Sequence, residues 1–147
     1  NDKQKTALIP KVVSHLGEDL SGKTIALWGL AFKPETDDIR EAPSLYIIDE
    51  LLARGAKIKV FDPEAMDNVK AKLGDKLEYA NSMYDAIANT DALIICTEWS
   101  IFRTTNCKKL RENLKKPIIF DGRNVYDVAA MEKEGFAYFS IGRKEGL

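Results

Sequence analysis

The chain has 147 residues, of which 45% are hydrophobic and 31% charged, a balance typical of one globular domain with a buried core. Its 22 basic and 23 acidic residues give a formal net charge of -1, so the overall field favours neither nucleic acid nor a membrane surface as a partner. No segment approaches the roughly 20 apolar residues of a membrane span, and the polar N-terminus lacks the apolar region of a signal peptide. We expect a cytoplasmic domain that begins inside a longer protein, because its first residue is not methionine.

Two cysteines and one histidine are the soft metal ligands of the chain, and they do not form a recognisable site. Cys96 lies in an apolar run and is expected to be a buried core residue. Cys107 precedes two lysines, which would lower a thiol pKa, but a helix-surface thiol without a role is the simpler interpretation. His15 is expected to be an ordinary helix residue, so no metal site is predicted.

The first predicted element is a helix. Apolar side chains recur at every fourth position over residues 7–16, and Gly17 is a suitable helix end. Pro10 lies inside this pattern and removes a helical hydrogen bond. We therefore expect the helix either to start near Ile9 or to kink there.

Strand-like and helix-like segments then alternate to the end of the chain. The predicted strands are residues 23–29, 57–61, 92–96, 117–120 and 136–139. The predicted helices are residues 43–54, 67–73, 82–89, 102–114 and 128–134. Alternation of this kind implies right-handed βαβ crossovers. The fold class is therefore α/β: a doubly wound, mostly parallel, five-stranded, Rossmann-like sheet with helices on both faces, preceded by the end of a long helix.

Ligands of an open parallel sheet bind beyond the carboxyl ends of its strands, so the segments that follow the strands are the candidate sites. Residues 29–40, after the first strand, contain one glycine where a dinucleotide-binding G-x-G-x-x-G has three. This segment is therefore not expected to cradle a pyrophosphate. Asp62 ends the second strand, where a ribose-binding acid would lie, but an aspartate before proline is equally a turn former.

Residues 29–40 contain cations and an aromatic side chain next to one of them. Lys33 follows Phe32 directly, Arg40 comes seven positions later, and Arg123 follows another strand. At one edge of the sheet Lys33 and Arg123 would converge on a single anionic group, since arginine suits phosphate as a fork and lysine as a movable charge. Alternatively, the charged residues of 33–40 form a solvated, ion-paired loop of little energetic weight. The residues alone leave both interpretations open.

The sequence of residues 29–44, GLAFKPETDDIREAPS, closely resembles a signature of the UDP-glucose/GDP-mannose dehydrogenase family. The signature opens the C-terminal, nucleotide-sugar-binding domain of that family. Residues 97–99 with Phe102, and residues 120–124, match further landmarks in the same order, and residues 1–5 resemble the end of the family's long central helix. The resemblance covers essentially the whole chain. It implies that residues 1–20 end the central helix and that residues 21–147 form the nucleotide-sugar-binding domain.

The family oxidises the C6 hydroxyl of a nucleotide sugar to a carboxylate and reduces two NAD in turn. The resemblance implies that Phe32 and Lys33 contact the nucleotide sugar, that Arg123 reaches it from the other strand end, and that Arg40 approaches NAD bound on a partner domain. The family's NAD fingerprint and catalytic cysteine lie in segments that this chain does not contain, and neither cysteine here matches the catalytic one. The chain alone is therefore expected to be inactive, with no catalytic residue of its own.

Several choices stay open within and beyond this resemblance. UDP-glucose, oxidised to UDP-glucuronate, is the expected substrate, and GDP-mannose or a UDP-N-acetylhexosamine is the alternative. The whole enzyme is expected to be a homodimer or a larger homo-oligomer. A non-catalytic, receiver-like signalling module would need an acidic cluster where Lys33 lies. A stand-alone nucleotide-binding enzyme is disfavoured by the missing glycines.

Overall fold

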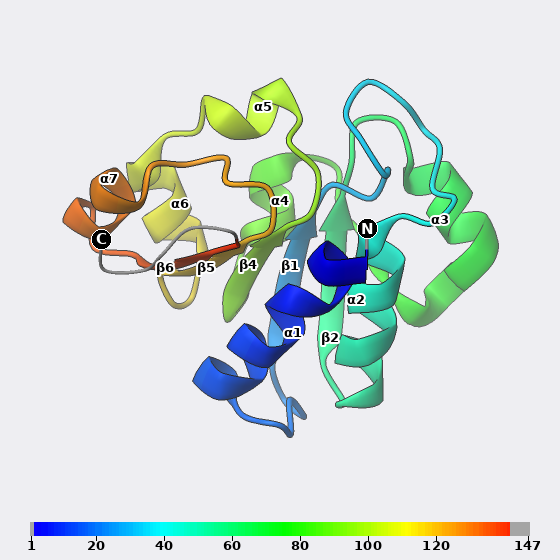
Figure 1. The fold of residues 1–147 in the computed structure, drawn as a ribbon, viewed down its shortest axis with the longest axis horizontal. Helices are drawn as coiled ribbons and strands as arrows, with labels where there is room; N and C mark the ends of the chain where they lie inside the picture. Colours follow the sequence, from blue (N-terminus) through cyan, green and yellow to red (C-terminus); the bar gives the residue numbers. More distant parts are fainter. Residues whose placement is uncertain (1, 142–147) are drawn as a thin grey trace.

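Six parallel strands form the sheet of this computed structural model, which describes residues 2–141 (Figure 1). The strand order is β3-β2-β1-β4-β5-β6. The strands are β1 (Thr24–Trp28), β2 (Lys57–Phe61), β3 (Glu78–Tyr79), β4 (Ala92–Ile95), β5 (Ile118–Asp121) and β6 (Ala137–Ser140). The order reverses between β1 and β4, which is where an open α/β sheet binds ligands.

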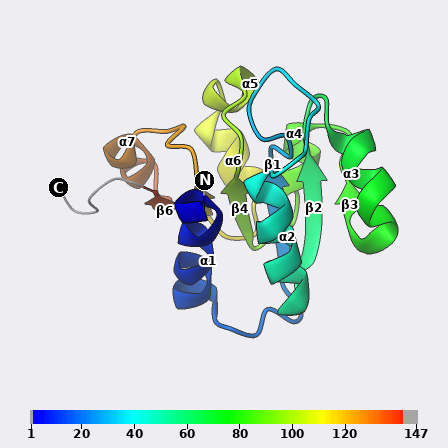
Figure 2. The same cartoon turned by 45° about the vertical axis from the view of Figure 1, so that its right-hand side comes forward.

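Helices cover both faces of the sheet, and none of those described is long and apolar enough to cross a membrane. One face carries α1 (Asp2–Leu16), α2 (Pro43–Ala53) and α3 (Met66–Leu73). The other face carries α4 (Met83–Ile87), α5 (Ser100–Arg103), α6 (Cys107–Asn113) and α7 (Val128–Lys133). A 3-10 helix, η1 (Gly74–Lys76), precedes β3. Figures 1 and 2 both show α1 and α2 side by side in front of the strands.

The central strands are buried on both faces, so they divide their side chains between two cores. In β1, Ile25 and Leu27 join the core beneath α1 and α2, whereas Trp28 joins the core beneath α4 and α6. The Trp28 ring stacks on Phe102 with ring centroids 4.9 Å apart. Continuous apolar runs are typical of such doubly covered strands. The predicted α/β class and helices on both faces are thus confirmed.

The sheet has one strand more than the five predicted. The extra strand, β3, pairs only Glu78 and Tyr79 with Lys59 and Val60 of β2. Two residues of mixed polarity do not make an apolar run, so hydrophobic periodicity gives no signal for this strand. It lies at one edge of the sheet, and β6 lies at the other.

The single helix predicted over residues 102–114 is wrong, because the chain forms two helices there, α5 and α6. Asn106 begins α6 as its N-cap, and its side-chain oxygen accepts hydrogen bonds from the backbone N–H groups of Lys108 and Lys109 at 2.9 and 3.3 Å. An asparagine cap satisfies donors that a continuous helix would bond to preceding carbonyls. The cap therefore starts a new helix within an uninterrupted apolar pattern.

Helix α1 does not start near Ile9 but runs through Pro10 from Asp2 to Leu16. Leu8, Ile9 and Val12 are buried against the neighbouring core. Burial of these side chains offsets the hydrogen bond that proline removes. One residue after Pro10, Lys11 Nζ donates to the Ser140 carbonyl of β6 at 3.1 Å, which joins α1 to the sheet edge.

Candidate functional site

The candidate residues lie at the carboxyl edge of the sheet, beside the point where the strand order reverses. Residues 30–42, which we call the β1–α2 loop, leave β1 at this edge, and both views show the loop and α5 there (Figures 1 and 2). The segments after β2, β4 and β5 leave the same edge because all strands are parallel. Phe32, Lys33 and Arg123 therefore share one edge, as the sequence predicts.

The start of the β1–α2 loop is held by three side chains from other parts of the fold. The N–H groups of Leu30 and Ala31 donate to Asp62 Oδ2 at 2.6 and 3.2 Å. The Ser44 hydroxyl donates to the Leu30 carbonyl at 2.7 Å, and the Thr97 hydroxyl donates to the Ala31 carbonyl at 2.6 Å. All four backbone polar groups of this dipeptide are thus bonded, so its position is fixed from β2, α2 and β4.

Phe32 and Lys33 follow directly from that fixed dipeptide, and both are exposed. Phe32 is 38% exposed, and Lys33 Nζ lies 5.3 Å from the centre of the Phe32 ring. The Phe32 N–H donates to the Asp38 carbonyl at 3.1 Å, which closes the loop on itself. An aromatic face and a cation are therefore presented together at the loop start.

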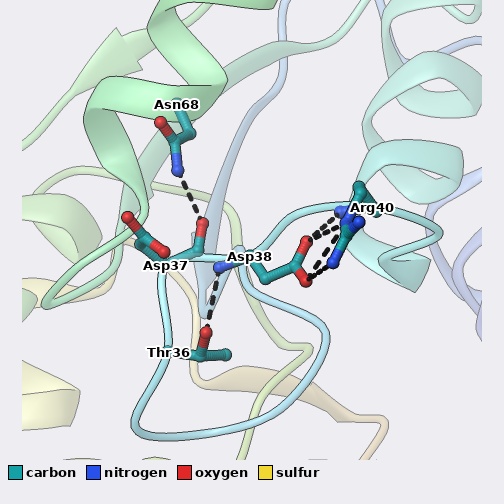
Figure 3. Close-up of polar contacts among 5 residues, drawn as sticks. All are labelled: Thr36, Asp37, Asp38, Arg40 and Asn68. Carbon is teal, nitrogen blue, oxygen red and sulfur yellow. Dashed lines mark hydrogen bonds and ion pairs between the residues drawn. The ribbon is translucent and has the colours of Figure 1, made fainter.

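Arg40 forms a two-pronged ion pair with Asp38 (Figure 3). Its Nε atom lies 3.0 and 3.2 Å from the two carboxylate oxygens, and its Nη2 atom lies 2.7 Å from Oδ2. Hydrogen bonding from Arg40 lowers the pKa of Asp38 to about 2. The Arg40 side chain is still 88% exposed. The solvated ion-paired interpretation thus holds for this half of the loop, and Arg40 remains reachable from solvent.

Two further hydrogen bonds order the middle of the loop (Figure 3). The Asp38 N–H donates to the Thr36 hydroxyl at 3.2 Å. The Asn68 side chain, from α3, donates to the Asp37 carbonyl at 2.8 Å. The loop is therefore tied to the α3 side of the sheet and does not hang free.

Arg123, after β5, is placed by two carboxylates. Its Nε and Nη2 atoms bond Glu98 Oε2 at 3.1 and 2.7 Å, and both side chains are 23% exposed. Burial opposes ionisation of Glu98, but hydrogen bonds from Arg123 and from its own backbone outweigh burial, so the Glu98 pKa is lowered. The Arg123 N–H donates to the fully buried Asp121 at 2.8 Å. The guanidinium is therefore held at a defined place on the edge.

The residues after β4 bridge the two candidate segments. Strand β4 separates β1 from β5, so Lys33 and Arg123 start from strand ends about 10 Å apart. Thr97 bonds the Ala31 carbonyl on one side, and Glu98 pairs with Arg123 on the other. The sequence analysis matched residues 97–99 to a family landmark without giving them these contacts. Their position after a central strand, at the point where the strand order reverses, was the signal that could have predicted the contacts.

Asp62 is not open to a ribose. It is fully buried, and its carboxylate accepts hydrogen bonds from five N–H groups. The donors are the backbone N–H groups of Leu30, Ala31, Glu64 and Ala65 and the indole Nε1 of Trp99, at 2.6 to 3.3 Å. The turn-forming interpretation of this residue is therefore favoured over ribose binding.

An acidic hollow of about 500 Å³ lies beside the loop. Its lining residues are Glu35, Thr36, Asp37, Glu64 and Trp99. Three carboxylates make the hollow unsuitable for an anion. Lys33 and Arg123 do not line this hollow.

The histidine, cysteine and carboxylate side chains were the remaining candidates for a site. No group of three or more histidine, cysteine or carboxylate side chains with metal-binding geometry occurs within residues 2–141. Cys96 is buried, as expected, and burial raises its pKa. Burial also raises the pKa of Cys107, so the neighbouring lysines do not activate that thiol. Neither cysteine is therefore an activated thiol.

Both a family model and individual proteins of known sequence match this chain. A family model described as the UDP-binding domain of the UDP-glucose/GDP-mannose dehydrogenase family matches residues 26–128. UDP-glucose 6-dehydrogenase of Rhizobium meliloti is 41% identical over 145 residues, which cover 99% of this chain and 33% of the relative. UDP-glucose 6-dehydrogenase TuaD of Bacillus subtilis is 41% identical over 143 residues, which cover 97% and 31%. The chain thus spans about a third of the length of these relatives.

Solved structures agree with the sequence comparison. A UDP-glucose dehydrogenase from Pyrobaculum islandicum superposes with a TM-score of 0.79 at 29% identity, covering 95% of this chain and 29% of that one. An NDP-N-acetyl-D-galactosaminuronic acid dehydrogenase from Methanosarcina mazei superposes with a TM-score of 0.78 at 27% identity, with the same coverage.

Proposed function

Because this chain belongs to the UDP-glucose/GDP-mannose dehydrogenase family as its UDP-binding domain, we propose that the complete protein is an NAD-dependent sugar-nucleotide 6-dehydrogenase. The proposed reaction converts UDP-glucose, two NAD⁺ and water into UDP-glucuronate, two NADH and three protons. NAD, when bound, accepts the two hydrides. This domain holds the nucleotide sugar, and the domain that carries most of the NAD site lies outside this chain.

The observation that carries the proposal is the pair of placed cations at the strand-order reversal. Lys33 follows β1 and Arg123 follows β5, with β4 between them, so two separate loops at one edge each offer a cation to one extended anionic ligand. The exposed Phe32 ring offers a face on which a ring of the ligand packs. Positioning of this kind supplies a large share of an enzymatic rate enhancement.

Arg40 is the residue of this chain that we assign to NAD. Its guanidinium is 88% exposed, and Asp38 bonds Nε and Nη2. Among the described residues, Nη1 has no partner, so it fits an anionic group that approaches from another domain. Asp38 orients the guanidinium for that contact.

We further assign residues 1–20 to the end of a central helix and residues 21–147 to the nucleotide-sugar-binding domain. Helix α1, which ends at Leu16, supports the first assignment. Cytoplasmic localisation and assembly into a homodimer or larger homo-oligomer stay predictions. Relatives named for UDP-glucose, at about 40% identity over nearly the whole chain, favour this substrate over GDP-mannose or a UDP-N-acetylhexosamine.

The test is steady-state kinetics of the complete protein, followed through NADH absorbance with UDP-glucose and NAD⁺. Lys33→Ala and Arg123→Ala each remove a charge-assisted contact of about 1.5–3 kcal/mol, which predicts a rise of about 10- to 100-fold in KM for UDP-glucose. Lys57→Ala removes an exposed cation at the opposite edge of the sheet and serves as the matched control. Arg40→Ala is expected to raise KM for NAD⁺ instead.

Two results would contradict this assignment. Wild-type kinetics in both Lys33→Ala and Arg123→Ala would remove these residues from the substrate site. Turnover of GDP-mannose or a UDP-N-acetylhexosamine in preference to UDP-glucose would replace the substrate and keep the reaction class.

A further inference from the structure

The buried Asp62 carboxylate lies where a dinucleotide-binding fold places part of its ligand. In such folds, backbone N–H groups after the first strand hold the pyrophosphate, and an acid after the second strand holds a ribose hydroxyl. Here the acid itself accepts the N–H groups of Leu30 and Ala31, directly after the first strand. An internal anion thus occupies donors that a bound anion uses elsewhere.

The five donors explain why this carboxylate is stable without contact to solvent. A buried polar group is costly unless it is hydrogen-bonded, and here Oδ1 accepts two of the N–H groups and Oδ2 accepts three. The N–H groups of Leu30 and Ala31 depend equally on Asp62, since these two residues are only 0% and 1% exposed. Without Asp62, their N–H groups would be buried without an acceptor.

Phe32 is the next residue after this bonded dipeptide, and Lys33 follows it. Because Ser44 and Thr97 hold the two carbonyls while Asp62 holds the two N–H groups, the dipeptide cannot turn to a new orientation without losing several bonds. The backbone from which Phe32 and Lys33 continue is therefore held by Asp62, directly after β2, together with Ser44 and Thr97.

We propose that Asp62 is the positioning residue of the nucleotide-sugar site, an internal anion that orders the loop start so that Phe32 and Lys33 meet the substrate. This role rests on the proposed function of Phe32 and Lys33. Asp62 contacts no substrate and acts through the Leu30–Ala31 dipeptide. The same arrangement leaves the Leu30 and Ala31 N–H groups unavailable to the pyrophosphate of a dinucleotide, which agrees with an NAD site carried mostly by another domain.

The test compares Asp62→Asn with Asp91→Asn in the complete protein. Asparagine keeps the size of aspartate but turns an NH₂ group toward N–H donors. Asp91 is a matched control because it is also buried and accepts a backbone N–H, from Thr24 at 2.9 Å, at the opposite edge of the sheet. Asp62→Asn is expected to raise KM for UDP-glucose about 10- to 100-fold, with kcat and KM for NAD⁺ close to wild type.

A merely structural role gives a different result. A destabilised enzyme has fewer active molecules, which lowers the apparent kcat and leaves KM for UDP-glucose unchanged. Asp91→Asn is expected to behave in that way. The same pattern in Asp62→Asn would overturn the proposal.

Amide hydrogen exchange supplies a readout that does not depend on catalysis. In Asp62→Asn, exchange over residues 30–40 is expected to rise while exchange in β4 stays at the wild-type rate. Faster exchange over residues 30–40 with an unchanged KM for UDP-glucose would overturn the positioning role. An exchange rate over residues 30–40 equal to that of the wild type would overturn it as well. If the wild-type protein does not turn over UDP-glucose, the proposed function fails, while the exchange data still report whether Asp62 orders the loop.

Ser44→Ala keeps the proposal testable if Asp62→Asn does not fold. It removes one of the four bonds, that to the Leu30 carbonyl, and leaves the carboxylate in place. A smaller rise in KM for UDP-glucose, with faster exchange confined to residues 30–40, is expected. A wild-type KM in a folded Ser44→Ala whose loop exchanges faster would overturn the proposal.

Discussion

Gly29 is a position where the addition of one methyl group, in Gly29→Ala, should strongly lower the free energy of unfolding. Its φ angle is +93°, a region that residues with a side chain rarely adopt. A Cβ atom added there would lie 2.5 Å from the Thr97 Cβ atom and 2.6 Å from the Thr97 backbone nitrogen. The backbone nitrogen cannot rotate away, so β1 and the end of β4 would have to separate. Gly29→Ala is therefore expected to destabilise the fold and to disturb the bond from Thr97 to Ala31.

The magnitude follows from two separate costs. A left-handed backbone conformation costs a residue with a Cβ atom roughly 1–2 kcal/mol. Forcing an extra methyl group into a packed site costs about 1–3 kcal/mol. Gly29→Ala should then lower the free energy of unfolding by about 2–5 kcal/mol, a large part of the roughly 5–15 kcal/mol that stabilises a typical domain.

The assay is urea unfolding of the purified protein, with Gly135→Ala as the matched control. Gly135 has nearly the same φ angle, +91°, but no atom lies within 4 Å of its added Cβ. Gly135→Ala should therefore show only the conformational cost of about 1–2 kcal/mol. Equal destabilisation by the two substitutions would refute the argument from the Thr97 contact.

Two further predictions concern ionisable side chains. Nuclear magnetic resonance titration should give Asp38 a pKa of about 2, below its ordinary 3.8, so its ion pair stabilises the loop above pH 4 and is lost as the pH falls through 2. Arg40→Ala should return that pKa toward 3.8, and an unchanged value would show that Arg40 is not the cause. In the folded protein a thiol reagent should modify half-buried Cys107 faster than buried Cys96, and unfolding should greatly reduce that difference by exposing Cys96. Faster reaction at Cys96 would contradict the described packing.

The strands were the most predictable part of the fold, because their signal is local. The run from Lys57 to Phe61 is apolar on one face and ends at an Asp-Pro pair, and β2 has these same bounds. The division of residues 102–114 into α5 and α6 depends instead on the Asn106 side chain. Its bonds to backbone N–H groups compete with a continuous helix. The periodicity of apolar residues does not reveal a side-chain cap of this kind.

The site was predictable only in part, because strand order decides which loops meet. The rule for parallel sheets correctly placed Lys33 and Arg123 at one edge. The roles of Asp62, Thr97 and Glu98 depend on β1 lying between β2 and β4, and on β4 lying beside β5. Their hydrogen bonds join residues 25 to 66 positions apart, which no motif within one segment can show.

The two outer strands bear on how the protein behaves at high concentration. An unpaired strand edge is a template for another chain, and proteins limit this hazard with short strands and with charged groups at the edge. Strand β3 is two residues long, and Glu78 within it lies 3.9 Å from Lys59 Nζ. At the opposite edge, Lys11 occupies the Ser140 carbonyl of β6. The β3 edge thus offers few backbone groups to a strand of a second molecule, and at the β6 edge one carbonyl is already bonded, which limits edge-to-edge aggregation of this parallel sheet.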